Sequence, residues 1–400
     1  MIATFKPCRL HGTINAPPSK SMAHRYLIGA ALSGQTCTLS GVDFSEDILA
    51  SMDCLSALGA HVTANGDTVT VDPAGFMQAE DPILRCRESG STLRFFIPLA
   101  LCLGRTVQFL GSERLFERPL EVYEELCREN GFTFKKGKTS LTLCGALQSG
   151  AYRVRGDISS QFITGLILAL VYLGKNASIE ILPPFESRSY IVLTLSALRS
   201  FGADVAFTDS YRIEIRPSEM HAFSGRIEGD YSNAAFLDAF NRIGSDIKLE
   251  NLRADSLQGD KVYADYFTQI SNGTPTLDIS NCPDLGPVLF ALAALKNGAT
   301  FTGTDRLKAK ESDRGAAMRE ELAKLGGRLV MGDNTITVSK QPLRYVGDRL
   351  DGHNDHRIVM AMSVILSQTG GSITGAEAIK KSYPGFFEDI KRLGAEVDLQ

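Results

Sequence analysis

The sequence predicts an α/β protein of two similar domains, each built from three βαβαββ units. Two observations lead to this prediction. The chain has 400 residues, which is too many for one ordinary core. Polar clusters that open apolar helical runs also recur along it, at positions 20, 90, 160, 232, 284 and 355, with steps of 70, 70, 72, 52 and 71 residues.

The elements of one unit follow in order from local patterns. The polar cluster opens an apolar helix, and four of these helices are predicted to stop at Gly34, Gly104, Gly174 and Gly298. A short strand comes next, for example at residues 36–40. A second helix should begin about 26 residues after each marker, near positions 46, 118, 187, 257, 310 and 381. An alternating strand pair, such as the one containing residues 212–216, closes the unit.

The phase of the repeat predicts the domain boundaries. The sixth unit stops after one strand, whereas residues 2–14 have the pattern of two strands, so we expect the N-terminal residues to complete the last unit. One domain is then discontinuous, residues 1–14 plus 226–400, and the other is continuous, residues 15–225. The fourth unit is about 20 residues short, which indicates that it lacks a strand or a loop.

Composition favours a cytoplasmic enzyme. The chain is 44% hydrophobic and 22% charged, and its net charge of −4 excludes a generally basic nucleic-acid coat. The apolar run at residues 95–103 spans nine residues and is interrupted by Pro98, whereas a membrane helix needs about 20. Residues 1–7 lack the apolar core of a signal peptide. We therefore expect a cytoplasmic monomer that binds neither nucleic acid nor membrane.

Several common cofactor motifs are absent or incomplete. No GxGxxG segment is present, so a dinucleotide site is not expected. Gly137-Lys138-Thr139 resembles the end of a P-loop, but Phe132 stands where its first glycine belongs. The eight cysteines form no CxxC pair, and His353 with His356 is too small a set for a metal site. We expect no cofactor and no metal.

The helix starts are candidate anion sites. A helix N-terminus presents unpaired N–H groups and a partial positive charge. For any one polar cluster N-capping is the simpler interpretation. Because the starts repeat within each domain, we expect them to point the same way and two such domains to form an electropositive cleft. Basic residues occur at these starts, namely Lys20, Arg25, Arg94, Arg118, Arg306, Lys308, Lys310, Arg314, Arg357 and Lys381.

Position assigns seven of these basic residues. Ligand roles are favoured for five of them: Lys20, Arg118, Arg314, Arg357 and Lys381. Arg306 and Lys308 are expected to be solvated.

Two acidic segments each have a plain and a functional interpretation. Asp284 opens an apolar helix, so it is either a capping residue or a general base. Lys310 and Arg314 should share one helix face with Glu311 between them, which is either a charged first turn or part of a site.

The sequence resembles the 5-enolpyruvylshikimate-3-phosphate synthase family over essentially its whole length. The segments that carry the resemblance are specific as an ordered set. They are Pro18-Ser19-Lys20-Ser21 with Arg25, Glu88-Ser89-Gly90-Ser91-Thr92-Leu93-Arg94, Glu117-Arg118-Pro119, Ser159-Ser160-Gln161, Lys310-Glu311-Ser312-Asp313-Arg314, Asn354-Asp355-His356-Arg357 and Lys381-Ser382-Tyr383-Pro384.

The resemblance implies an enolpyruvyl transferase-type fold, an inside-out α/β barrel in each domain, with the active site in the interdomain cleft. It implies transfer of the enolpyruvyl group from phosphoenolpyruvate to the 5-hydroxyl of 3-phosphoshikimate. The products are 5-O-(1-carboxyvinyl)-3-phosphoshikimate and phosphate, formed by addition and elimination through a tetrahedral intermediate. This is a step of the shikimate pathway to chorismate and the aromatic amino acids, and it needs no cofactor.

The resemblance also implies residue roles. The residues matched to 3-phosphoshikimate binding are Lys20, Ser21, Arg25, Ser159, Ser160, Gln161, Ser187, Asp284 and Lys310. Those matched to phosphoenolpyruvate binding are Lys20, Gly90, Arg118, Gln161, Arg314, Arg357 and Lys381. Asp284 matches the acceptor of the 5-hydroxyl proton, Glu311 the group that protonates the methylene carbon, and Lys20 a further group that handles protons.

The sequence departs from the family pattern at two places. The usual Asn-Ala-Gly-Thr stretch is Glu88-Ser89-Gly90-Ser91 here, but Gly90 is kept, so we expect family-typical sensitivity to glyphosate. Arg306 stands where the family often has an asparagine that contacts the shikimate phosphate.

Three other functions fit the sequence less well. A transferase acting on UDP-N-acetylglucosamine would have a cysteine within residues 111–118, where this chain has none. An RNA 3′-phosphate cyclase-like enzyme would need a basic groove, which the net charge does not support. A catalytically inactive phosphate-ester binding protein would not need Asp284, Lys310 and Glu311.

Overall fold

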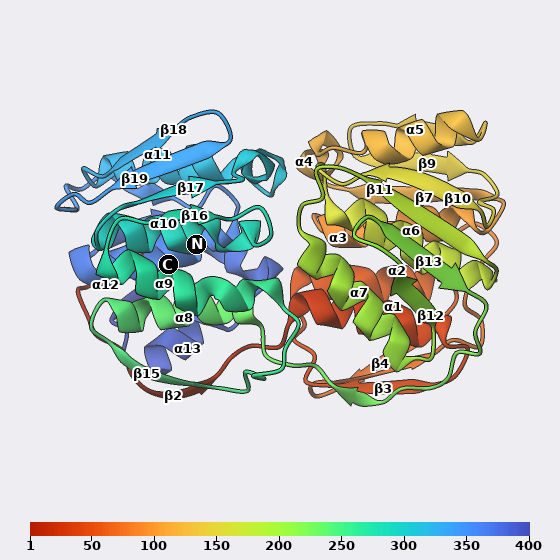
Figure 1. Ribbon diagram of the computed structural model, residues 1–400. Helices are drawn as coiled ribbons and strands as arrows, with labels where there is room; N and C mark the ends of the chain where they lie inside the picture. The colour runs from red at the N-terminus through yellow and green to blue at the C-terminus, as the bar shows by residue number, and fades with distance from the viewer. The chain divides into compact units, whose positions relative to one another are not determined.

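The chain passes twice between two compact units, as the computed structural model of residues 1–400 shows (Figure 1). The continuous unit is Pro18–Glu228, and the discontinuous unit joins Met1–Pro17 to Gly229–Gln400. The sequence placed these boundaries three residues earlier, after positions 14 and 225.

The continuous unit contains seven α-helices and three sheets. The helices are α1 (Lys20–Leu32), α2 (Glu46–Ala57), α3 (Gly90–Leu101), α4 (Glu113–Glu117), α5 (Glu121–Glu129), α6 (Ser160–Leu173) and α7 (Arg188–Ser200). The strands are β3 (Cys37–Ser40), β4 (His61–Asn65), β5 (Thr68–Asp72), β6 (Ile83–Arg87), β7 (Thr106–Gly111), β8 (Thr133–Lys136), β9 (Ser140–Cys144), β10 (Ala151–Arg155), β11 (Ala177–Leu182), β12 (Asp204–Phe207), β13 (Arg212–Arg216) and β14 (Gly225–Arg226).

The discontinuous unit has six α-helices, four 3-10 helices and three sheets. The α-helices are α8 (Tyr231–Arg242), α9 (Tyr263–Asn272), α10 (Gly286–Leu295), α11 (Arg314–Lys324), α12 (His356–Thr369) and α13 (Phe386–Arg392). The 3-10 helices are η1 (Gly259–Val262), η2 (Pro283–Leu285), η3 (Asp305–Ala309) and η4 (Ala376–Lys381). The strands are β1 (Ile2–Phe5), β2 (His11–Asn15), β15 (Asp246–Glu250), β16 (Thr276–Asp278), β17 (Ala299–Thr302), β18 (Arg328–Met331), β19 (Thr335–Ser339), β20 (Leu350–Asp351), β21 (Gly371–Thr374) and β22 (Val397–Leu399).

The sheets confirm the predicted α/β repeat. In the sheet β10-β11-β13-β12, the first two strands are parallel and the others pair antiparallel, as a βαβαββ unit requires. The sheets β6-β7-β9-β8 and β16-β17-β19-β18 repeat this order. The fourth repeat lacks the closing strand pair, because its sheet contains only β15 and β2. All six sheets are open, and none closes on itself as a barrel.

The expectation that both N-terminal strands complete the last unit was wrong for one of them. β1 pairs with β21 and β22 of the last repeat, but β2 pairs in parallel with β15 of the fourth. In exchange, β14 comes from the far end of the continuous unit to pair in parallel with β3. Since β15 has no closing strand pair, β2 supplies backbone partners that it would otherwise lack.

Buried helices form the centre of each unit. Eleven of the 14 residues of α6 are buried, and α10 and α12 are buried along most of their length. A helix that is apolar on all sides must be covered on all sides, and in Figure 1 strands lie on both sides of α1 and α6. The four predicted glycine stops follow helix ends, and all have positive φ, from 62° to 80°.

Two of the predicted second-helix starts are accurate, and two basic positions are corrected. α2 begins at Glu46 and α7 at Arg188. Lys310 and Lys381 instead lie at the ends of η3 and η4, and the α-helices begin at Arg314 and Phe386. Lys310 and Arg314 therefore do not share a helix face. No helix combines the length and the apolar character needed to cross a bilayer.

Candidate functional site

Serines cap the three central helices of the continuous unit. Ser19, Ser89 and Ser159 accept hydrogen bonds from the backbone N–H groups of Met22, Thr92 and Gln161 respectively. The capping interpretation therefore holds for these residues. Their caps leave the next residues, which include Lys20, Gly90 and Ser160, in the first turn of each helix.

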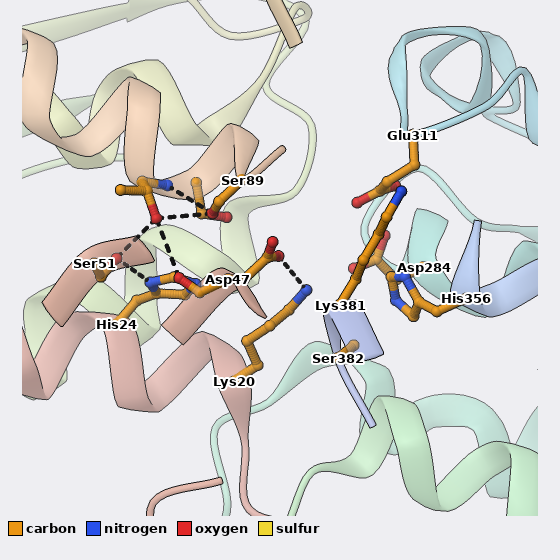
Figure 2. A network of polar contacts seen from close by, with 12 residues as sticks. Lys20, His24, Asp47, Ser51, Ser89, Asp284, Glu311, His356, Lys381 and Ser382 are labelled. Carbon is orange, nitrogen blue, oxygen red and sulfur yellow. Dashed lines mark hydrogen bonds and ion pairs between the residues drawn. The ribbon is translucent and has the colours of Figure 1, made fainter. Parts of the chain in front are cut away.

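Lys20 is held by an acidic residue that the sequence analysis missed. Its Nζ lies 2.6 Å from Oδ2 of Asp47, in the first turn of α2, and both side chains are largely buried (Figure 2). Asp47 is 27 residues away from Lys20 in the sequence. The only signal that could have predicted this pair is the repeat, because it places the starts of α1 and α2 close together.

A buried polar network fixes the starts of α1, α2 and α3 relative to one another (Figure 2). His24 Nδ1 lies 2.8 Å from Ser51 Oγ, and Ser51 Oγ lies 2.8 Å from Thr92 Oγ1. Thr92 donates to Ser89 Oγ at 2.8 Å. Burial, followed by the charges of Lys20 and Arg25, lowers the pKa of His24 well below its usual range, so this network is neutral.

Arg118 is the strongest anion-binding candidate in this unit. Its side chain is only 7% exposed, and its Nε atom is buried without a hydrogen-bond partner. It packs against Gly90, where an added Cβ would lie 2.5 Å from Nη1 of the guanidinium. A buried guanidinium with unused donors, set against a helix start, suits an oxyanion.

Gln161 is oriented by two neighbours. Arg94 Nη1 donates to its Oε1 at 2.7 Å, and its Nε2 donates to Ser91 Oγ at 2.8 Å. These contacts bring the starts of α3 and α6 together, as the repeat predicts.

Arg25 and Ser187 are both buried. Arg25 donates to Thr194 Oγ1 and to the carbonyl oxygens of Ser21 and Tyr190. Burial lowers the pKa of Arg25 to about 10, so it remains charged at neutral pH. Ser187 precedes α7 in the left-handed region, with φ of 53°.

The discontinuous unit gathers three cations around Asp284. Lys310 Nζ and Arg314 Nη1 each lie 2.9 Å from its Oδ1, and Arg357 Nη2 lies 3.1 Å from its Oδ2. Asp284 lies in η2, and its carboxylate accepts from these side chains. These contacts of the Asp284 side chain are ion pairs with three cations.

Arg314 links three carboxylates and is fully buried. Besides Asp284, it contacts Glu311 Oε2 at 2.7 Å and Asp355 Oδ2 at 2.8 Å. Burial alone would lower the pKa of Arg314, but the three carboxylates raise it above its ordinary value. Asp355 caps α12. The sequence analysis placed it in a polar cluster at a helix start but gave it no partner and no role.

Lys381, Glu311 and Asp284 lie in the same part of the discontinuous unit (Figure 2). Lys381 Nζ donates to the carbonyl oxygen of Asn354 at 2.6 Å. Arg357 also donates to Ser232 Oγ at 2.6 Å.

The charges set the protonation states of Asp284 and Lys310. Burial would raise the pKa of Asp284, but Arg357, Lys310 and Arg314 together hold it well below its usual range. Burial lowers the pKa of Lys310 to about 8, and Arg314 and Arg306 add to this effect while Asp284 opposes it. The cluster is thus a carboxylate surrounded by cations that could also bind an anionic ligand.

One prediction about solvation was wrong. Lys308 is exposed, as expected, but Arg306 is only 8% exposed. It lies in η3 near Lys310, where its charge acts on that lysine rather than on solvent.

The histidines at 353 and 356 do not form a pair of ligands. His353 Nε2 lies 2.7 Å from Glu321 Oε1, next to Glu320. These three residues could offer ligand atoms within 4.8 Å of one another, but Lys324 Nζ already lies 2.9 Å from Glu321. An ammonium group at this place opposes a metal cation.

The comparisons with known proteins agree over the whole chain. The family model for EPSP synthase (3-phosphoshikimate 1-carboxyvinyltransferase) matches residues 5–390. A 3-phosphoshikimate 1-carboxyvinyltransferase from Clostridium kluyveri is 38% identical over 418 aligned positions, which cover 99% of this chain and 98% of that protein. One from Clostridium perfringens is 35% identical, with 97% of each chain covered.

Solved structures show the same fold. EPSP synthase from Acinetobacter baumannii superposes with a TM-score of 0.80 at 22% identity, covering all of both chains. An enolpyruvyl transferase from Streptomyces tendae superposes with a TM-score of 0.76 at 14% identity, covering 99% of this chain and 98% of that one.

Proposed function

The chain belongs to the EPSP synthase family, and we propose that its two units each supply part of the contacts to 3-phosphoshikimate and phosphoenolpyruvate. The chain is a 3-phosphoshikimate 1-carboxyvinyltransferase of the shikimate pathway. It transfers the enolpyruvyl group to the 5-hydroxyl and releases phosphate.

In this proposal 3-phosphoshikimate takes its contacts from both units. Arg25 holds its carboxylate, and the hydroxyl groups of four serines, with Lys310, hold its phosphate. These serines are Ser21, Ser159, Ser160 and Ser187. Lys20, Gln161 and Asp284 complete the set. The contacts of Gln161 with Arg94 and Ser91 support its role because they fix the amide in one orientation.

Phosphoenolpyruvate would bind where the remaining cations lie. The proposed contacts are Lys20, Gly90, Arg118, Gln161, Arg314, Arg357 and Lys381. The observation that carries this assignment is Arg118, because its buried guanidinium has an unused donor beside the first turn of α3. An anionic ligand would satisfy the guanidinium and the helix N–H groups together.

Proton transfer is assigned to three groups. Asp284 takes the proton of the 5-hydroxyl as that oxygen bonds to the central carbon of phosphoenolpyruvate. Glu311 protonates the methylene carbon to give the tetrahedral intermediate, and loss of a proton from the new methyl group expels phosphate. Lys20 is a further candidate for handling these protons.

The charges around Asp284 suit a base that acts only in the loaded site. In the free protein three cations hold its pKa low, which makes it a weak base. The substrates bring several negative charges, and their oxygens would draw Lys310, Arg314 and Arg357 toward themselves. Asp284 would then regain basicity when the hydroxyl is in place.

The test is a phosphate-release assay with each substrate alone and with both together. We expect release only when both are present. An inactive phosphate-ester binding protein would bind 3-phosphoshikimate in calorimetry yet release no phosphate from the mixture, and that result would contradict the proposal.

Three further properties belong to the same proposal. We propose that the protein acts in the cytoplasm, as a monomer, and that glyphosate inhibits it. Gly90 supports the last point, since the absence of a side chain lets the Arg118 guanidinium lie against the first turn of α3, where it could bind a small anionic competitor of phosphoenolpyruvate.

A further inference from the structure

We infer that His353 and Glu321 are positioning residues for phosphoenolpyruvate, because they hold the turn that orients Lys381 and Arg314. The inference rests on the proposed function, since that function assigns Lys381 and Arg314 to phosphoenolpyruvate. Neither His353 nor Glu321 belongs to the proposed contacts.

The turn has an uncommon backbone conformation. His353 and Asn354 follow each other in the left-handed region, with φ values of 48° and 49°. Neither residue is glycine, so this conformation is sterically disfavoured and needs support from its surroundings. The turn leads directly into Asp355, the N-cap of α12.

That support comes from Glu321, a fully buried carboxylate on α11. Its Oε1 lies 2.7 Å from His353 Nε2, and its Oε2 accepts from the backbone N–H of Asp351 at 2.9 Å. Asp351 in turn accepts from the backbone N–H of His353 at 2.7 Å. The Glu321 carboxylate therefore binds the turn at two points, the Asp351 backbone and the His353 side chain, and we call this arrangement the clamp.

The same turn carries two groups into the site. The carbonyl oxygen of Asn354 accepts from Lys381 Nζ at 2.6 Å, and Asp355 Oδ2 accepts from Arg314 Nε at 2.8 Å. Arg314 and Glu321 lie seven residues apart on α11, so one face of this helix holds the turn at two points. If the turn relaxed, the Asn354 carbonyl would rotate and Lys381 would lose its anchor.

The clamp is sensitive to protonation. The groups that face His353 are Glu321, Glu320 and Lys324 of α11 and Asp351 of β20. The hydrogen bond to Glu321 raises the pKa of His353 above 6.5, although burial opposes it, and the charges of Glu321, Asp351 and Glu320 add to the rise. The charged clamp is therefore complete below pH 6.5 and weakens as pH rises through the raised pKa.

The first test compares KM for the two substrates. We expect His353→Ala to raise KM for phosphoenolpyruvate about tenfold and KM for 3-phosphoshikimate less than twofold. His353→Gln can still donate to Glu321 but cannot titrate, so it should keep KM for phosphoenolpyruvate within about threefold of wild type. Across the pH range in which the wild-type KM for phosphoenolpyruvate rises, the KM of His353→Gln should stay constant. His11→Ala, an exposed histidine of the same unit, is the matched control.

A double-mutant cycle tests whether His353 acts through Lys381. If it does, adding His353→Ala to Lys381→Ala should raise KM for phosphoenolpyruvate by less than twofold further. Independent, multiplicative effects would overturn the inference. An unchanged KM for phosphoenolpyruvate in His353→Ala would also overturn it, as would a wild-type pH profile in His353→Gln. If His353→Ala does not fold, the pH profile of His353→Gln decides.

The two proposals fail in different ways. If Lys381→Ala itself leaves KM for phosphoenolpyruvate unchanged, the assignment of that lysine to the substrate is wrong. If Lys381→Ala raises KM and His353→Ala does not, the assignment stands and the clamp is rejected.

Discussion

Single atoms decide the anion-binding character of the continuous unit. The missing side chain of Gly90 leaves room for the Arg118 guanidinium beside the first turn of α3. The Nε of that guanidinium is buried without a partner, which is costly in the free protein. An oxyanion of a substrate could accept a hydrogen bond from this buried Nε–H group.

Gly90→Ala should weaken phosphoenolpyruvate binding. The new Cβ would lie 2.5 Å from Arg118 Nη1, so the flexible end of the arginine must move away. We expect KM for phosphoenolpyruvate to rise roughly tenfold, equivalent to about 1.4 kcal/mol, with little change in thermal stability. Steady-state kinetics would check this, with Gly150→Ala as the matched control because an added Cβ there meets nothing within 4 Å. An unchanged KM in Gly90→Ala would contradict the packing argument.

Lys310 should make 3-phosphoshikimate binding depend on pH. Because burial lowers the pKa of Lys310 to about 8, the free protein loses this charge as pH rises through 8, whereas a bound phosphate keeps the proton on. We expect Kd to rise above pH 8 by up to about tenfold per pH unit. Calorimetry from pH 7 to 9.5 would measure the slope.

Lys310→Arg provides the comparison for that slope. Its guanidinium stays charged throughout the range, so the rise in Kd should disappear. If wild type and variant follow the same curve, Lys310 is not the group that titrates.

At the scale of elements, the helix starts bring distant acidic and basic residues together. Asp355 caps α12 through the backbone N–H of Arg357 and also pairs with Arg314 at the start of α11. Both Asp355 and Arg314 are fully buried. One carboxylate thus fixes the relative position of two helices.

Asp355→Asn should destabilise the discontinuous unit. The amide can still cap α12, but Arg314 loses a buried counter-charge, and breaking such a pair costs about 3 kcal/mol. Urea unfolding would report the loss. Asp313→Asn is the matched control, because Asp313 caps α11 through Ala316 without an ion pair and should change stability by less than about 1 kcal/mol. A similar small loss in Asp355→Asn would contradict the expected role.

The sequence predicts helix starts better than it predicts their partners. The starts of α1, α3 and α6 follow from a local cap and an apolar run, so the pattern locates them. Near position 118 the predicted helix is split, because Arg118 precedes Pro119 and is extended, with ψ of 151°. The repeat pattern alone did not predict this break between α4 and α5.

The two acidic residues whose partners the sequence did not predict share one property. Asp47 pairs with Lys20 across 27 residues, and Asp355 pairs with Arg314 across 41. An isolated acid has no local signal that distinguishes such a partner from a cap. The repeat shows which helix starts are equivalent, but side-chain partners depend on tertiary packing.

At the scale of the whole molecule, the proposed substrate contacts predict that binding and stability are coupled. A ligand that binds the folded protein alone stabilises it by mass action, by about 2.7 kcal/mol at a concentration of 100 times Kd. The proposed contacts to 3-phosphoshikimate include Arg25 in one unit and Lys310 in the other.

The expected result is a higher melting temperature and a smaller radius of gyration with 3-phosphoshikimate. Thermal unfolding and small-angle scattering would measure these, with shikimate as the control that lacks the phosphate. A raised melting temperature with an unchanged radius would indicate that one unit binds the ligand by itself.

The pairing of β1 with β21 and β22 also orders events during synthesis. Thr4 leaves the ribosome 368 residues before Ser372, its cross-strand hydrogen-bond partner. Residues 18–228 emerge in between and carry all of their own strands, so they can fold first. β1 must wait with unpaired strand edges until β21 and β22 have been synthesised, which exposes these edges to aggregation in the nascent chain.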